Sequence, residues 1–239
     1  MQPIKPVLAD NLADLDRRLR ALEFGRQPYI GDWYELPISQ YIYNGTPGVM
    51  DTTADQISRF AIGDKIWTTT SGNEAYYYVT QIDRVNNQVH FYAGTTYTLG
   101  GQPDVVRVSK LQSPVGFPSR FFAPVNAGAL NTMTASNVSS AIIFHMSGRL
   151  IFMIGNVSGI TLGGVASNTF KLVYPTELPS TGESNLQFVN TCDNVGTPIF
   201  IELQTTAELH MIVAKQDGTN FALGSTTAYV AIQYISNYS

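Results

Sequence analysis

The sequence predicts a mainly β protein with one short α-helix at its N-terminus. Only 13% of its residues are charged, about half the usual share of roughly 25%. Thr, Ser, Asn and Gln must therefore supply most of the polar surface. Thirteen Tyr, 12 Phe and 20 Gly accompany them, a composition typical of strands and turns. From residue 58 onward, β-branched and aromatic runs alternate with turn-forming clusters, which is the strand signal.

A leucine seam predicts the helix, within a first segment of residues 1–27. The seam consists of Leu8, Leu12, Leu15, Leu19 and Leu22, the spacing of a two-heptad coiled coil. In a parallel oligomer, Arg18 and Glu23 would face each other across the interface with opposite charge. Gly25 and Pro28 end the helix. Because an isolated helix of about fifteen residues is marginal in water, we expect it to join several chains or to anchor the protein; packing on its own domain is the alternative.

Three further segments precede the last domain. Residues 28–52 are aromatic, contain Pro and Gly and lack a steady hydrophobic period, so they are predicted to be an extended linker arm; packing of this segment onto the domain that follows is an equal alternative. Residues 53–112 are predicted to form a small antiparallel β-barrel or sheet, because runs such as AYYYVTQID and NQVHFYAG are separated by turn clusters. Residues 113–128 carry three prolines and two glycines and are predicted to be a linker between domains.

The last segment, residues 129–239, is predicted to be an antiparallel β-sandwich of the jelly-roll type. Its strand-like runs include SAIIFHM, RLIFMIG and ELHMIVAK. Turn clusters recur at roughly the 8–12-residue spacing that is typical of a sandwich. Asp217 and Gly218 form a dipeptide that is a strong hairpin signal.

The search for chemistry predicts no catalytic, cofactor or metal site. His90, His145 and His210 lie singly in strand-like runs, without the paired spacing of metal ligands. Cys192 is the only cysteine, so no intramolecular disulfide forms, and no nucleophile motif surrounds it. The G-x-S-x-G, P-loop and dinucleotide patterns are absent. We therefore expect a protein that is not an enzyme; a polysaccharide-degrading enzyme is the alternative.

Charge and hydropathy predict where the protein works. A net charge of −4 argues against nucleic-acid binding. The first thirty residues lack an unbroken apolar core, so no signal peptide is expected. The longest apolar stretch, residues 141–155, is interrupted by His145 and Arg149 and is too short to cross a membrane. The sequence predicts a soluble protein made in a cytosol.

One region carries a family resemblance. Residues 60–99, FAIGDKIWTTTSGNEAYYYVTQIDRVNNQVHFYAGTTYTL, followed by SPVGFPSRF, resemble a module of tailed-bacteriophage structural proteins. The shared features are the Gly-Asp-Lys-Ile start, the aromatic-Val-Thr strand and the Gly-x-x-Tyr-Thr-Leu turn. An N-terminal coil leading into β-modules is also similar to phage fibre, tail-tip and head-fibre subunits, which are commonly homotrimers.

The resemblance implies a virion protein, made in the host cytoplasm. It would be a homotrimeric tail fibre or tail-tip subunit, held by other virion proteins through residues 1–50, with its C-terminal domain exposed for attachment to a host glycan or protein. A capsid decoration or head-fibre protein, anchored by the N-terminal arm, is one alternative. A carbohydrate-binding, lectin-like sandwich is another, with Tyr174, Phe221, Tyr229, Tyr234 and Tyr238 as candidate platforms. Each of these aromatics could instead pack in the core or between subunits.

Overall fold

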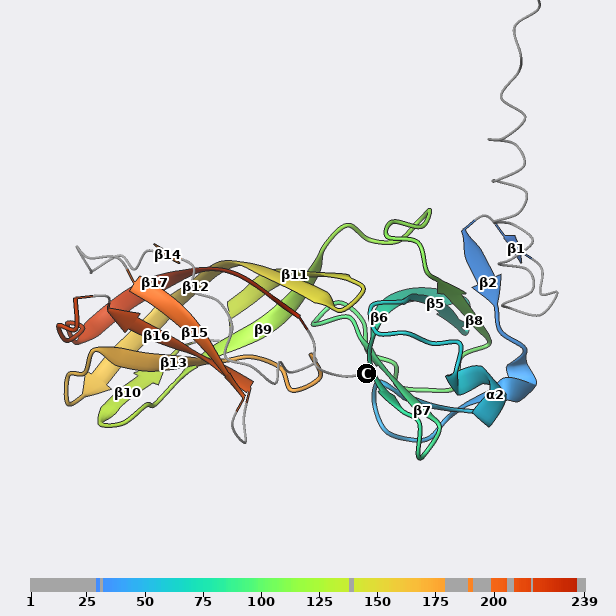
Figure 1. The fold of residues 1–239 in the computed structure, drawn as a ribbon, viewed down its shortest axis with the longest axis horizontal. Helices are drawn as coiled ribbons and strands as arrows, with labels where there is room; N and C mark the ends of the chain where they lie inside the picture. Colours follow the sequence, from blue (N-terminus) through green and yellow to red (C-terminus); the bar gives the residue numbers. More distant parts are fainter. Residues whose placement is uncertain are drawn as a thin grey trace, which may run out of the picture.

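The computed structural model describes residues 29–30, 32–137, 140–178, 189–190, 199–205, 209–215 and 217–235. The chain is mainly β, with 57% strand and 4% helix. The described strands form two antiparallel sheets, and neither closes into a barrel. Figure 1 shows them as two modules side by side, with β1–β8 in one and β9–β17 in the other. The helix predicted over residues 1–27, with its leucine seam, lies outside the described residues.

The first module is an eight-stranded sheet. Its strands, in spatial order, are β1 (Tyr29–Ile30), β2 (Trp33–Glu35), β8 (Val105–Ser109), β5 (Lys65–Thr70), β6 (Asn73–Asp83), β7 (Gln88–Tyr92), β4 (Val49–Thr52) and β3 (Tyr41–Tyr43). Two short helical turns, η1 (Ile38–Gln40) and α2 (Ala54–Ile57), connect them. Ile66 pairs with Tyr77 on one side and Val108 on the other. Because side chains alternate across a strand, these residues share one buried face.

Residues 29–52, apart from residue 31, which is not described, belong to the module that follows, as the alternative to a linker arm predicts. These residues contribute β1, β2, β3 and β4 to the first sheet. Trp33, Tyr34 and Tyr41 are each at most 5% exposed, so their apolar area is removed from water by packing on the module that follows. Tyr34 pairs directly with Val108. The arm therefore forms part of the folded module rather than a free connection.

The second module is a nine-stranded antiparallel sheet. Its order is β10 (Met133–Ser136), β12 (Leu150–Gly164), β11 (Ser140–Ser147), β9 (Phe121–Gly128), β13 (Thr169–Val173), β16 (Leu209–Lys215), β15 (Ile199–Thr205) and β14 (Val189–Asn190), and β17 (Gly224–Ile235) pairs with β12. The first part of β9 pairs with β11 and its last three residues pair with β13. Strand β9 thus joins two groups of strands whose buried residues belong to the same core.

The linker predicted over residues 113–128 ends earlier than expected. Residues 121–128 form β9, a strand inside the second sheet. Phe121, Ala123 and Val125 are fully buried and alternate with less buried neighbours, which is the period of a half-buried strand. Pro124 lies in the part of β9 that pairs only with β11. Its missing N–H therefore costs no backbone hydrogen bond to a second neighbouring strand.

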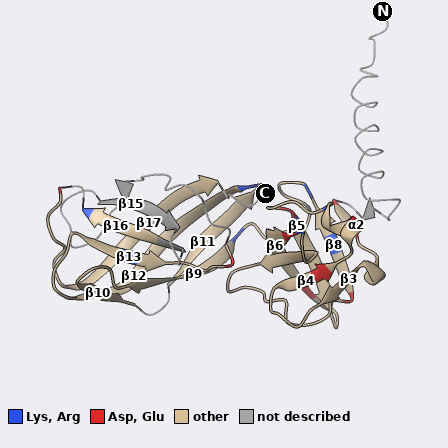
Figure 2. Cartoon of the chain, turned by 60° about the horizontal axis from the view of Figure 1, so that its bottom comes forward, with Lys and Arg blue, Asp and Glu red and all other residues tan. Residues whose placement is uncertain are grey.

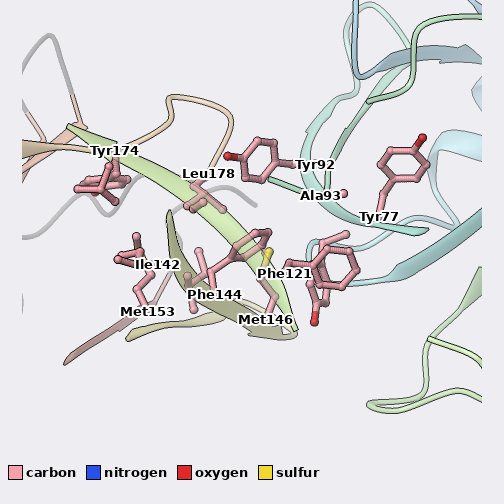
Figure 3. Close-up of a cluster of buried hydrophobic side chains, with 14 of the residues drawn as sticks. Tyr77, Tyr92, Ala93, Phe121, Ile142, Phe144, Met146, Met153, Tyr174 and Leu178 are labelled. Atoms are coloured by element: carbon pink, nitrogen blue, oxygen red, sulfur yellow. The ribbon is translucent and has the colours of Figure 1, made fainter. Parts of the chain in front are cut away.

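The two modules share one continuous hydrophobic core. The ring of Tyr78 on β6 lies 5.1 Å from that of Phe121 and 5.9 Å from that of Phe144, both in the second module. Tyr92 on β7 lies 5.4 Å from Phe144, and Figure 3 shows Tyr92, Phe121 and Phe144 in one cluster of buried side chains. Gly94 approaches so closely that a Cβ atom there would overlap the carbonyl oxygen of Phe122. The modules are therefore packed together rather than loosely tethered.

Candidate interaction surfaces

Large hydrophobic side chains lie exposed on the outer surface of the second module. Phe122 is 39% exposed, Phe152 37%, Ile154 44%, Tyr229 40% and Ile235 62%. The intervening residues Ile151 and Met153 on β12 point inward and are almost fully buried. In a sheet with one wet face, the outward positions are usually polar. Here both faces of β12 are apolar along Leu150 to Ile154.

Strand register brings most of these outward residues into one continuous area. On β12, Phe152 lies between His145 of β11 and Gln233 of β17, and Ile154 lies between Ile143 and Ala231. Directly opposed residues on one face are close enough for their side chains to touch. Ile143 in turn pairs with Phe122 on β9. We call the set Phe122, Ile143, Phe152, Ile154, Tyr229, Ala231 and Ile235 the apolar face.

The apolar face is also free of charge. Strands β9, β11, β12 and β17 contain no Asp, Glu, Lys or Arg, and in Figure 2 β9 and β12 run in tan, the colour of uncharged residues. A shallow pocket of about 240 Å³ lies between Phe152, Ile154, Ala231 and Gln233. Soluble proteins normally place charged side chains on open sheet surfaces to prevent association. An open sheet face without charged residues is therefore unusual for a sheet with one face in solvent.

His145 does not place a charge on this surface either. Its Nδ1 lies 2.9 Å from the hydroxyl of Tyr78. Burial lowers the pKa of His145, and the nearby positive charge of Lys65 lowers it further. The Lys65 ammonium donates a hydrogen bond to the carbonyl of Gly63 and a longer one to that of Met146 in the second module. The imidazole is therefore neutral at pH 7 and helps to hold the two modules together.

A second concave feature lies in the first module, where the β5–β6 hairpin meets the loop of residues 94–101. It is a groove of about 420 Å³. Its lining residues are Thr70, Asn73, Glu74, Ala75, Tyr77, Thr96, Tyr97, Thr98, Leu99, Gly100 and Gly101. They combine two aromatic rings with hydroxyl, amide and carboxylate groups. Ligand sites also combine aromatic side chains with placed polar groups.

Backbone hydrogen bonds fix the walls of the groove. The N–H of Gly48 donates to the carbonyl of Leu99 over 2.9 Å. The N–H of Ser71, in the β5–β6 turn, donates to a carboxylate oxygen of Asp104 over 2.7 Å. The side-chain oxygen of Gln102 accepts a hydrogen bond from the N–H of Tyr43. These hydrogen bonds tie the loop that follows Gly94 to the β5–β6 turn and to residues 43–48, so the two sides of the groove are held in place.

Most of the predicted glycan platforms are buried, which corrects that expectation. Tyr174 is 2% exposed and Phe221 and Tyr234 are each 1% exposed, so none of them can stack on a ligand from solvent. Phe221 packs edge-to-face on Phe170 with ring centroids 5.2 Å apart. Tyr229 alone among the described platforms is exposed, and it belongs to the apolar face. Tyr238 lies outside the described residues.

Neither surface was predicted from the sequence. The sequence contains an indication of the apolar face, because the runs SAIIFHM and RLIFMIG do not alternate regularly between apolar and polar residues. The sequence contains no such indication of the groove, because its two sides come from two separate segments, residues 70–77 and 96–101. Among the described residues, no group of three or more His, Cys, Asp or Glu is placed to hold a metal ion.

Comparisons with known proteins place the chain in no family. No family model matches it, and no curated protein or solved structure matches it either. In the part of the chain that the structure describes, no helix is long and apolar enough to span a membrane.

Proposed function

We propose that the protein is a structural subunit of a tailed-bacteriophage virion, a homotrimeric tail fibre or tail-tip protein whose copies pack through the apolar face. The observation that supports association between copies is the uncharged apolar face of the second module. Such a surface is costly to leave in water. Closed cyclic symmetry would cover it on every copy. The trimeric state and the place in the virion come from the resemblance of residues 60–99.

The size of the face suits a contact between protein chains. At about 200 Å² for a fully exposed aromatic side chain, Phe122, Phe152 and Tyr229 each leave roughly 80 Å² in water. With the two exposed isoleucines, the face reaches a few hundred Å², the size of the largest apolar patch on a typical monomer, which is often functional. A standard interface buries about 800 Å² per partner, with a polar rim around its apolar centre. The face is large enough to be that centre.

The single cysteine supports the same proposal. A chain with only Cys192 cannot gain stability from an intramolecular disulfide, and a virion assembled in a reducing cytosol would not rely on one. Stability must come from buried apolar area, and association adds to that area. In this proposal the second module is a sandwich of the jelly-roll type exposed for host attachment, and residues 1–50 are held by other virion proteins.

The direct test locates the protein in the particle. Antibodies raised against the purified chain are expected to label intact virions of the encoding phage in immunogold electron microscopy. Label at the tail tip supports a tail subunit, and label over the shell supports a capsid decoration or head fibre. Particles from a phage with the gene deleted serve as the control. Unlabelled particles, with the protein present only free in the lysate, would contradict a virion role.

A further inference from the structure

The groove of the first module is a built site that the assembly described above does not use. Among the residues that line the groove, the half-buried Tyr97 presents a partly exposed aromatic ring. The Tyr97 ring packs edge-to-face on Tyr76 and on Tyr77, with centroids 6.1 and 6.2 Å away. Tyr77 is itself held by stacking on Phe91. A ring fixed in this way loses little conformational entropy when a ligand binds.

Polar groups surround this ring. Asn73, Glu74, Thr96 and Thr98 are exposed around the groove. A carboxylate oxygen of Glu74 accepts a hydrogen bond from the Tyr76 hydroxyl over 3.0 Å, which orients the carboxylate. Burial raises the pKa of Tyr77 to about 12, so its phenol stays neutral. The groove therefore offers hydroxyls and an amide that both donate and accept, and one oriented acceptor.

The charges of the residues that line the groove exclude several classes of ligand. The groove contains one carboxylate and no Lys, Arg or His. An anionic ligand would be repelled by Glu74, and single-stranded nucleic acid requires a cationic groove. A purely apolar ligand would leave the polar rim without partners, which is costly. A neutral ligand with one apolar face and many hydroxyls satisfies both parts of the lining.

We propose that this groove binds a neutral saccharide, with the C–H face of one sugar ring against Tyr97 and its hydroxyls bonded to Glu74, Asn73 and the threonines. The volume of about 420 Å³ lies within the range of roughly 300–1,000 Å³ that small-molecule sites occupy. The site lies in the first module, away from the sandwich aromatics that the sequence indicated. It does not depend on the virion role or on the oligomeric state.

Saturation-transfer NMR on the full chain tests the proposal. The probes are glucose, galactose, N-acetylglucosamine, lactose and chitobiose. At least one is expected to receive saturation from the protein and to bind with a millimolar or lower dissociation constant. Tyr97→Ala should weaken that binding about tenfold or more, as when a central aromatic anchor is removed. Tyr97→Phe keeps the ring and should bind within about threefold of the unchanged protein.

Two further variants make the result specific to the groove. Glu74→Gln keeps the shape of an exposed side chain and removes the charged acceptor, so it should weaken binding severalfold even if Tyr97→Ala does not fold. Tyr229→Ala, on the apolar face, is the matched control and should bind like the unchanged protein. The proposal is overturned if no probe binds up to about 10 mM, if Tyr97→Ala and Glu74→Gln bind normally, or if Tyr229→Ala alone abolishes binding.

Discussion

Replacing Phe152 with aspartate is expected to dissociate the proposed trimer into single chains. Phe152 lies on β12 within the apolar face, between His145 and Gln233. A carboxylate there would be buried in the interface without a cationic partner, which costs more than the lost ring alone. Losing a central aromatic costs about 2 kcal/mol or more, so the dissociation constant should rise at least about thirtyfold. Light scattering over a dilution series measures the change.

Thr161→Asp is the matched control for this substitution. Thr161 is exposed on the same strand, and its neighbours in the sheet are Ser136 and Ser225. It therefore tests the cost of an aspartate in β12 without placing a charge among apolar residues. Thr161→Asp should keep the mass of the unchanged protein. If Phe152→Asp also keeps it, or if both variants dissociate equally, the apolar face is not the interface.

The second large expected effect is a loss of folding stability when the contact between the two modules is disrupted. Tyr78 is fully buried, and its ring lies within 6 Å of those of Phe117, Phe121 and Phe144. Tyr78→Ala leaves a cavity shared by both modules, and such truncations cost about 3–5 kcal/mol. Tyr78→Phe keeps the ring and removes the hydroxyl with its hydrogen bonding to His145 and to the Met146 backbone, which should cost about 1–2 kcal/mol. The two variants separate packing from hydrogen bonding at one position.

Urea denaturation distinguishes these variants with two probes. Trp33 and Trp67 are the only tryptophans and both lie in the first module, whereas far-ultraviolet circular dichroism reports on both modules. The unchanged protein should give coincident transitions, because the modules share one core. Tyr78→Ala should separate the two transitions and move the first to lower urea. Equal midpoints for Tyr78→Ala and Tyr78→Phe would show that this contact does not couple the modules.

Composition and alternation predicted the β class but misplaced two boundaries. The three prolines and two glycines of residues 113–128 favour a linker, although Phe121, Ala123 and Val125 already alternate as in a strand. Strands β1 to β4 have only two to four residues each, which is too short for a period to show. Only pairing with distant strands, as between Tyr34 and Val108, reveals them.

The two candidate surfaces are harder to predict, for two physical reasons. A continuous apolar run such as RLIFMIG is equally typical of a strand buried on both faces and of a strand whose second face binds a partner. The sequence also does not show which way an aromatic side chain points, so buried Tyr234 and exposed Tyr229 were equal candidates. The groove needs residues 70–77 and 96–101 together, and only the folded sheet brings them together.

The solution mass of the purified full chain, beside a chain lacking residues 1–27, tests the assembly most directly. Light scattering is predicted to give a mass near three times the 26.2 kDa of one chain. The same multiple should persist without residues 1–27, because the apolar face lies in the second module. Monomers in both cases would contradict self-association. A trimer lost on truncation would place the essential contact in the leucine seam and contradict the apolar face as the main interface.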